Sequence, residues 1–82
     1  MIGTVVRADA GRDKGRFFAI IACDGDYILI ADGKKRKLCA PKRKSLKHVK
    51  FTNTVIELPQ TDKGLRAALH RFNYGDLCER GV

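Results

Sequence analysis

The residues with the clearest chemistry are the cations between positions 34 and 50. This segment reads KKRKLCAPKRKSLKHVK and holds nine Lys or Arg residues without one acidic residue. The whole chain has 17 basic and 9 acidic residues, a net charge of +8, so this segment accounts for the entire excess. Such a density of like charge is self-repulsive until an anion neutralises it, and a polyphosphate backbone is the commonest such partner. The segment therefore indicates a nucleic-acid-binding surface.

The alternative interpretation of this segment is a solvated basic loop that only keeps the protein soluble. Apolar residues interrupt the charges, among them Leu38, Cys39, Ala40 and Leu46. Such interruptions favour cations that are mounted on a folded scaffold over cations on a free tail. The segment lacks the helical spacing of large apolar side chains that membrane-surface helices use, so we expect no membrane partner.

A second group of cations lies in the glycine-rich stretch DAGRDKG at residues 9–15. Gly11 would let the backbone bend tightly and let a phosphate approach the amides, whereas Gly15 is interpreted as a plain turn residue. Asp13 is expected to fix the turn by bonding a nearby amide. The predicted nucleic-acid-binding residues are Arg12, Lys14, Arg16, Lys34, Lys35, Arg36, Lys37, Lys42, Arg43, Lys44, Lys47, His48 and Lys50.

The sequence offers little for catalysis or for metal binding. His48 and His70 have no carboxylate or cysteine partner nearby in the sequence. The GRDKG stretch lacks the spacing of a P-loop and is followed by an apolar run instead of a helix. The three cysteines lack a C-x-x-C pair, so we interpret them as small buried residues of a reducing compartment. We therefore expect no enzyme, no cofactor or metal, and no small-molecule substrate.

Short apolar runs separated by glycine turns predict the scaffold that carries these cations. Asp24-Gly25 between two apolar runs is a strong hairpin signal, and Pro41 would close the fourth strand. In the fifth strand, Val49 and Phe51 would face inward. Short strands with tight turns fit a small closed β-barrel. The expected strands cover residues 2–8, 17–23, 27–31, 36–40 and 48–52.

The residues after Pro59 predict a short C-terminal helix. Thr61 offers an N-cap, and an apolar stripe follows at i, i+3, i+4 and i+7. The stripe consists of Leu65, Ala68, Leu69 and Phe72. Since Phe17 and Phe18 must point to opposite faces of a strand, we expect one in the core and the other under this helix. The expected organisation is a barrel at 1–58 with the basic loop 34–50, and a helical extension at 59–82 packed on it.

The length of 82 residues allows one small domain. No apolar run approaches the length that crosses a bilayer, and the N-terminus lacks the apolar block of a signal peptide. We therefore expect a cytoplasmic protein.

Residues 5–31, VVRADAGRDKGRFFAIIACDGDYILIA, resemble a KOW motif, the RNA-binding unit of several ribosomal proteins and of NusG-class transcription factors. The likeness rests on Gly11, on the Lys14-Gly15 pair and on the alternating apolar residues around them. Its continuation through the basic segment is similar to bacterial KOW proteins related to the eukaryotic and archaeal large-subunit ribosomal ones. The resemblance covers about residues 2–54. It implies an SH3-like β-barrel whose first turn and neighbouring loops contact RNA, with ribosomal RNA and ribosomal proteins as partners.

Two other functions stay open from the sequence. The protein could be an interaction module of the translation or transcription machinery, which would use the barrel or the C-terminal helix. Duplex DNA would be bound by the same cations as RNA. Because the chain has only six aromatic residues, four Phe and two Tyr, we expect phosphate contacts to dominate. The expected ligand is structured RNA, recognised by shape and charge with little sequence preference.

Overall fold

The computed structural model describes residues 2–75 of the chain. The fold is mainly β, with five strands followed by one α-helix, as the sequence predicts. The strands are β1 (Thr4–Ala8), β2 (Phe17–Asp24), β3 (Tyr27–Ala31), β4 (Lys42–Ser45) and β5 (Val49–Val55). A 3-10 turn, η1 (Leu46–His48), joins β4 to β5, and α1 (Asp62–His70) runs into the π-helical turn η2 (Arg71–Gly75).

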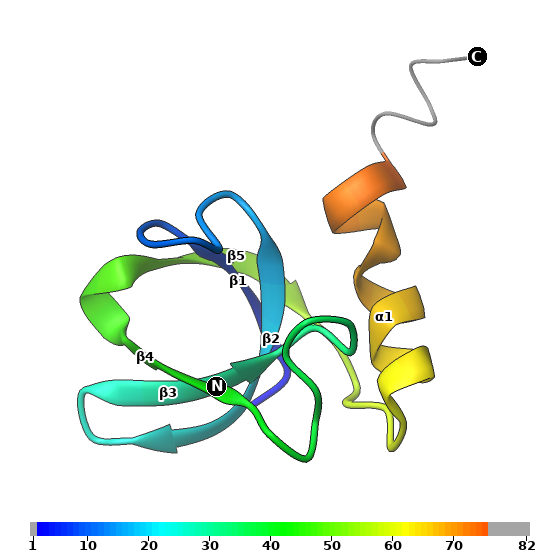
Figure 1. Ribbon diagram of the computed structural model, residues 1–82, viewed down its shortest axis with the longest axis horizontal. Coiled ribbons are helices and arrows are strands. Elements are labelled where there is room, and N and C mark those ends of the chain that lie inside the picture. The colour runs from blue at the N-terminus through cyan, green and yellow to red at the C-terminus, as the bar shows by residue number, and fades with distance from the viewer. Residues whose placement is uncertain (1, 76–82) are drawn as a thin grey trace.

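The five strands form one antiparallel sheet in the order β4-β3-β2-β1-β5. The sheet curls into a barrel-like outline, in which η1 connects the two edge strands and α1 lies on the far side, beyond β2 (Figure 1). The expected closed barrel is wrong in one respect, because no strand pairing joins β4 to β5 in residues 2–75. The connection through η1 takes the place of that last ladder.

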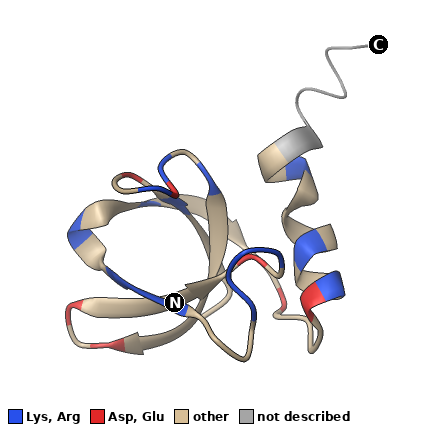
Figure 2. Ribbon diagram, in the orientation of Figure 1, with Lys and Arg blue, Asp and Glu red and all other residues tan. Residues whose placement is uncertain are grey.

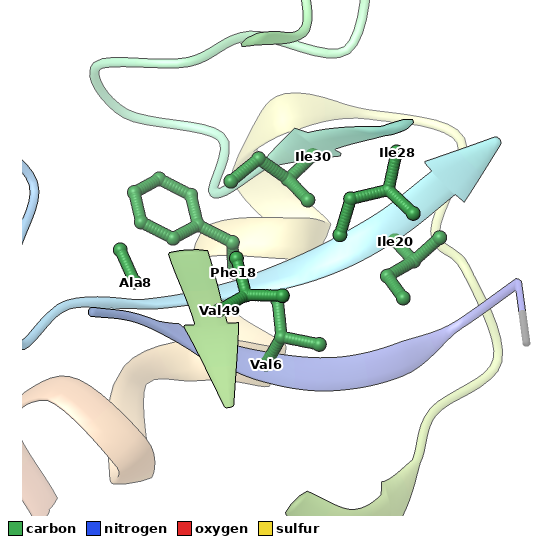
Figure 3. Packing of buried hydrophobic residues seen from close by; sticks show 7 residues of the cluster. All are labelled: Val6, Ala8, Phe18, Ile20, Ile28, Ile30 and Val49. Carbon is green, nitrogen blue, oxygen red and sulfur yellow. The ribbon is translucent and has the colours of Figure 1, made fainter. Parts of the chain in front are cut away.

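The alternation of side chains along each strand gives the sheet two apolar faces. The inner face forms the core of the curled sheet, and the outer face of β1, β2 and β3 packs against α1. The inner cluster consists of Val6, Ala8, Phe18, Ile20, Ile28, Ile30 and Val49, whose side chains point toward one another in Figure 3. The outer cluster contains Val5, Ala19, Ala31, Leu65 and Leu69.

The adjacent phenylalanines at the start of β2 divide between these clusters, as predicted. Phe18 is fully buried in the inner cluster, and Phe17 packs under α1, where its ring lies 5.5 Å from that of Phe72. The apolar stripe of α1 is therefore a packing face. The helix begins as expected, since Thr61 Oγ1 accepts a hydrogen bond of 3.0 Å from the Gly64 amide.

The fourth strand lies later in the chain than the sequence predicts. Residues 36–40 form a turn, and Pro41 precedes β4 instead of ending it. The reason is the Asp32 carboxylate, whose Oδ1 accepts hydrogen bonds from the amides of Lys34 and Arg36 at 2.9 and 3.0 Å. These bonds hold the backbone in a compact loop, which leaves residues 42–45, three of them basic, to pair with β3.

Two side-chain predictions are wrong, and a third holds in part. Phe51 lies opposite the core residue Val6, on the inner side of the sheet as predicted, but it is 45% exposed because β5 is an edge strand of an open sheet. Cys23 and Cys39 are exposed instead of buried, since they lie at the end of β2 and in the turn before β4. The third cysteine lies outside the described residues, as does the last part of the expected helical extension.

Candidate nucleic-acid interface

Four of the thirteen predicted binding residues contact groups inside the protein. Two of them pair with Asp13, whose carboxylate is only 4% exposed. Asp13 Oδ2 lies 3.1 Å from Arg36 Nη2 and 3.7 Å from Lys42 Nζ. The expectation that Asp13 bonds a nearby amide is wrong. Its carboxylate instead joins the first turn (residues 9–15) to the loop before β4 and to β4 itself.

The third inward-directed cation, Arg16, pairs with the buried Asp32. Arg16 Nη2 donates to Asp32 Oδ2 at 3.1 Å, and the carboxylate side chain is 1% exposed. Burial by itself would raise the pKa of Asp32, but the amide bonds from Arg36 and Lys34 and the charge of Arg16 outweigh it. The pKa of Asp32 is therefore lowered from its ordinary value of 3.8.

The fourth, Lys44, is 8% exposed and points inward from β4. Its Nζ donates a hydrogen bond of 2.7 Å to the carbonyl of Ala10, in the first turn. A second bond to the same turn runs from the Asp9 amide to the His48 carbonyl at 2.8 Å. The first turn is thus fixed both to β4 and to η1.

An open hollow of about 530 Å³ lies where the first turn, β3, β4 and η1 meet. Within it, the guanidinium of Arg43 lies over the ring of Tyr27, with Cζ 4.1 Å from the ring centroid. Its lining contains three Lys or Arg residues and a histidine, and none of the lining residues is acidic. The lining residues are Ala10, Gly11, Tyr27, Arg43, Lys44, Ser45, Lys47 and His48.

The remaining cations are on the surface, in separate places. Three basic stretches can be followed in Figure 2: the first turn, the loop before β4, and β4 with η1. The basic segment 34–50 is therefore not one loop, because its first part lies near α1 and its second part builds the hollow. The exposed members of the predicted set are Arg12, Lys14, Lys34, Lys35, Lys37, Arg43, Lys47, His48 and Lys50.

Sequence reasoning did not find Tyr27 as part of this site. Tyr27 lies opposite Ser45 in the β3–β4 ladder, which sets it diagonally across from Arg43 on the same face. The only signal in the sequence was an aromatic residue directly after the Asp24-Gly25-Asp26 hairpin. Since the position of β4 was predicted wrongly, the pairing of that ring with Arg43 could not be predicted.

Comparisons with protein-family models and with curated proteins give no match for this chain. The KOW resemblance therefore rests on the residues quoted above. Within residues 2–75, no cluster of three or more His, Cys, Asp or Glu side chains could hold a metal ion. None of the helices described is long and apolar enough to cross a bilayer.

Proposed function

We propose that the protein binds structured RNA through the exposed cations of the hollow and of the first turn. The observation that carries the proposal is the hollow itself, where Arg43, Lys47 and His48 surround a space with no acidic lining residue. The first turn adds two exposed cations, Arg12 and Lys14, which come soon after the lining residue Gly11 in the sequence. Cations in this arrangement can replace counterions on several phosphates at once.

The internal ion pairs support the same proposal, because they make the surface rigid. Asp13 and Asp32 form ion pairs with Arg16, Arg36 and Lys42, so that part of the positive charge serves to fix the loops. The outward-facing cations are then held on a frame and need little ordering when a ligand binds. The KOW resemblance makes ribosomal RNA the proposed ligand and a ribosomal or ribosome-associated role in the cytoplasm the proposed setting.

The direct test is fluorescence anisotropy with an RNA hairpin of about 16 base pairs. The variant Arg43→Gln/Lys47→Gln removes two exposed charges of the hollow. We expect at least tenfold weaker binding at about 50 mM salt, and a salt slope that is lower by about two. If its affinity and salt slope equal those of the wild type, the hollow is not the RNA surface.

The matched control is Lys63→Gln/Arg66→Gln, which removes the same charge from exposed positions on α1. Figure 1 shows α1 and η1 at opposite sides of the molecule. We expect this variant to keep most of its affinity. Charge reversal across Lys42, Arg43 and Lys44 is a poorer test, because Lys42 and Lys44 contact Asp13 and the Ala10 carbonyl.

The ribosomal setting has its own test, which is sedimentation of the native protein in a cell extract at low and high salt, with and without nuclease. We expect co-migration with the large ribosomal subunit that is lost when salt is added. Migration at the top of the gradient in every condition would remove the ribosome from the proposal. Competition between matched RNA and DNA duplexes separates the two nucleic acids, because only RNA has 2′-hydroxyls.

A protein partner is the second candidate function, and the edge strand β5 favours it. Phe51 and Val55 are 45% and 68% exposed on this strand, which has an unpaired edge within residues 2–75. Exposed apolar residues beside an open sheet edge are suited to strand addition by another chain. A protein partner would stay bound after nuclease treatment, whereas a partner bridged by RNA would be lost.

A further inference from the structure

The hollow has a feature that phosphate binding alone does not use. Tyr27 is the one aromatic residue in its lining, and its side chain is 41% exposed. The guanidinium of Arg43 lies 4.1 Å above the ring centroid, so a flat cationic group covers a flat ring at the surface. Aromatic rings and arginine planes are the two kinds of side chain on which unpaired RNA bases stack.

Further cations line the same hollow as this stack. Lys47 and His48 come from η1, and Lys44 comes from the adjacent strand. An ammonium carries three donors, and the structure shows Lys44 giving one of them to the Ala10 carbonyl. The hollow thus combines a stacking surface with phosphate-binding groups.

The frame of the hollow is held by three separate hydrogen bonds. The Leu46 amide donates to the Asp26 carbonyl at 3.0 Å, which fixes η1 to the β2–β3 hairpin. The other two are the bonds to the first turn, from Asp9 to His48 and from Lys44 to Ala10. The volume of about 530 Å³ is within the range of sites for single small ligands. A preformed hollow of this size costs little ordering on binding.

We infer that the hollow receives one unpaired nucleotide of the RNA. Its base stacks on the Tyr27–Arg43 pair, and its phosphate contacts Lys47 and His48. This inference rests on the proposed RNA binding and gives it a preference: RNA with a bulged or flipped-out nucleotide binds more tightly than the same RNA fully paired. The protein would then recognise not only the shape and charge of the RNA but also one extruded base.

The test compares two RNA hairpins of about 16 base pairs, which differ only in a single bulged 2-aminopurine nucleotide. The fluorescence of 2-aminopurine falls when the base stacks on a ring. With the wild-type protein, we expect about tenfold tighter binding of the bulged hairpin, together with quenching of its fluorescence. Equal affinity for both hairpins without quenching would overturn the inference and leave the proposed function standing. Failure to bind either hairpin would overturn both.

Variants of Tyr27 assign the effect to the hollow. Tyr27→Leu should lose the preference for the bulge and the quenching, so that it binds both hairpins with similar affinity. Tyr27→Phe keeps the ring and should keep both signals. An unchanged circular dichroism spectrum of Tyr27→Leu shows that its loss of preference is not a loss of folding. Phe51→Leu is the matched control, because Phe51 is an exposed ring outside the hollow. A loss of preference in Phe51→Leu that equals the loss in Tyr27→Leu would overturn the assignment.

Arg43→Lys separates the flat guanidinium from its charge. We expect about threefold loss of the bulge preference, since an ammonium cannot offer a stacking plane. Adenosine 5′-monophosphate distinguishes a nucleotide within RNA from a free one. We expect it to compete with the bulged hairpin only weakly, because it lacks the neighbouring phosphates. Tighter binding of adenosine 5′-monophosphate than of the bulged hairpin would overturn the assignment to RNA.

Discussion

Two regions of this protein contain the same kinds of residue, but their cations have different roles. The Asp32 loop (residues 32–38) and the hollow each combine several cations with a glycine whose φ is +80°, Gly33 and Gly11 respectively. In the Asp32 loop, a buried carboxylate takes up the charge of Arg16, and α1 packs against the backbone at Gly33. In the hollow, no acidic residue is present and the space stays open. Arg16 therefore serves the fold beside a buried aspartate, whereas Arg43 and Lys47 are exposed where no acidic residue lines the space.

The largest effect is expected from removal of the Asp32 carboxylate. Asp32→Ala would remove the carboxylate that accepts hydrogen bonds from the Arg16 guanidinium and from the amides of Lys34 and Arg36. We expect a loss of about 3 kcal/mol in the free energy of unfolding, because the ion pair of a buried carboxylate and two hydrogen bonds from backbone amides are lost together. Urea denaturation followed by circular dichroism measures this loss.

The control for that variant is Asp26→Ala, since Asp26 is an exposed carboxylate in the β2–β3 hairpin. Its stability should stay close to that of the wild type. Asp32→Asn is an intermediate case, because its amide oxygen can still accept from the backbone but carries no charge for Arg16. Equal stability of Asp32→Ala and Asp26→Ala would show that the loop does not depend on its carboxylate.

A second test compares the two glycines directly. An alanine Cβ at Gly33 would collide with the Asp62 carbonyl and lie 2.9 Å from the Arg66 amide, whereas at Gly11 it would meet only Lys44 Nζ at 3.5 Å. Both variants carry the strain of positive φ, about 1 kcal/mol. Gly33→Ala adds a collision with helix backbone, so we expect it to cost about 2 kcal/mol more than Gly11→Ala in thermal or urea unfolding. Similar losses of stability in both variants would mean that α1 shifts at little cost to accommodate the added methyl group.

The sequence predicted the fold well where local signals and periodicity agree. The β2–β3 hairpin with its Asp-Gly turn, the Thr61 cap and the apolar stripe of α1 all follow from residues close together in the chain. The fourth strand was misplaced because the loop before it is also held by contacts that are distant in the sequence. The Leu38 amide donates to Asp62 and the Arg36 guanidinium donates to Asp13, and no local pattern in residues 36–45 shows these partners.

The candidate site could be predicted only as a set of charges. Net charge and spacing located the basic residues, but they could not tell which cations meet a buried acid. That distinction depends on Asp13 lying beside both Arg36 and Lys42, which are 23 and 29 positions further on (36 − 13 and 42 − 13). The stacking of Arg43 on Tyr27 likewise follows from the β3–β4 register alone.

A third test assigns opposite roles to two arginines of the basic segment. Arg36 donates to the buried Asp13, while Arg43 is exposed on β4. Arg36→Gln should cost about 1 kcal/mol of unfolding free energy, a value discounted because its side chain is 34% exposed. Its RNA affinity, measured by anisotropy below its melting temperature, should change little.

Arg43→Gln should show the reverse pattern, with unchanged stability and several-fold weaker RNA binding. The pair of variants thus separates a cation of the fold from a cation of the surface. Loss of both stability and affinity in each variant would mean that the Asp32 loop and the hollow act as one unit. The contrast between the two regions would then be wrong.

The smallest expected effect is the pH dependence that Asp32 gives to stability. The pKa of Asp32 in the folded protein lies below 3.8, its ordinary value and the value expected in the unfolded chain. Between these two pKa values the unfolded chain binds more protons, so the stabilisation is complete above the unfolded pKa and is lost as the pH falls through the folded one. Asp32→Asn has no carboxyl group to titrate at this position. Because all other carboxyl groups are the same in both proteins, their contributions cancel in the difference in unfolding free energy between this variant and the wild type. We expect this difference to be constant above about pH 5 and to shrink below pH 3.8. A difference that stays constant down to about pH 2 would show that the charge of Asp32 adds nothing beyond its amide bonds.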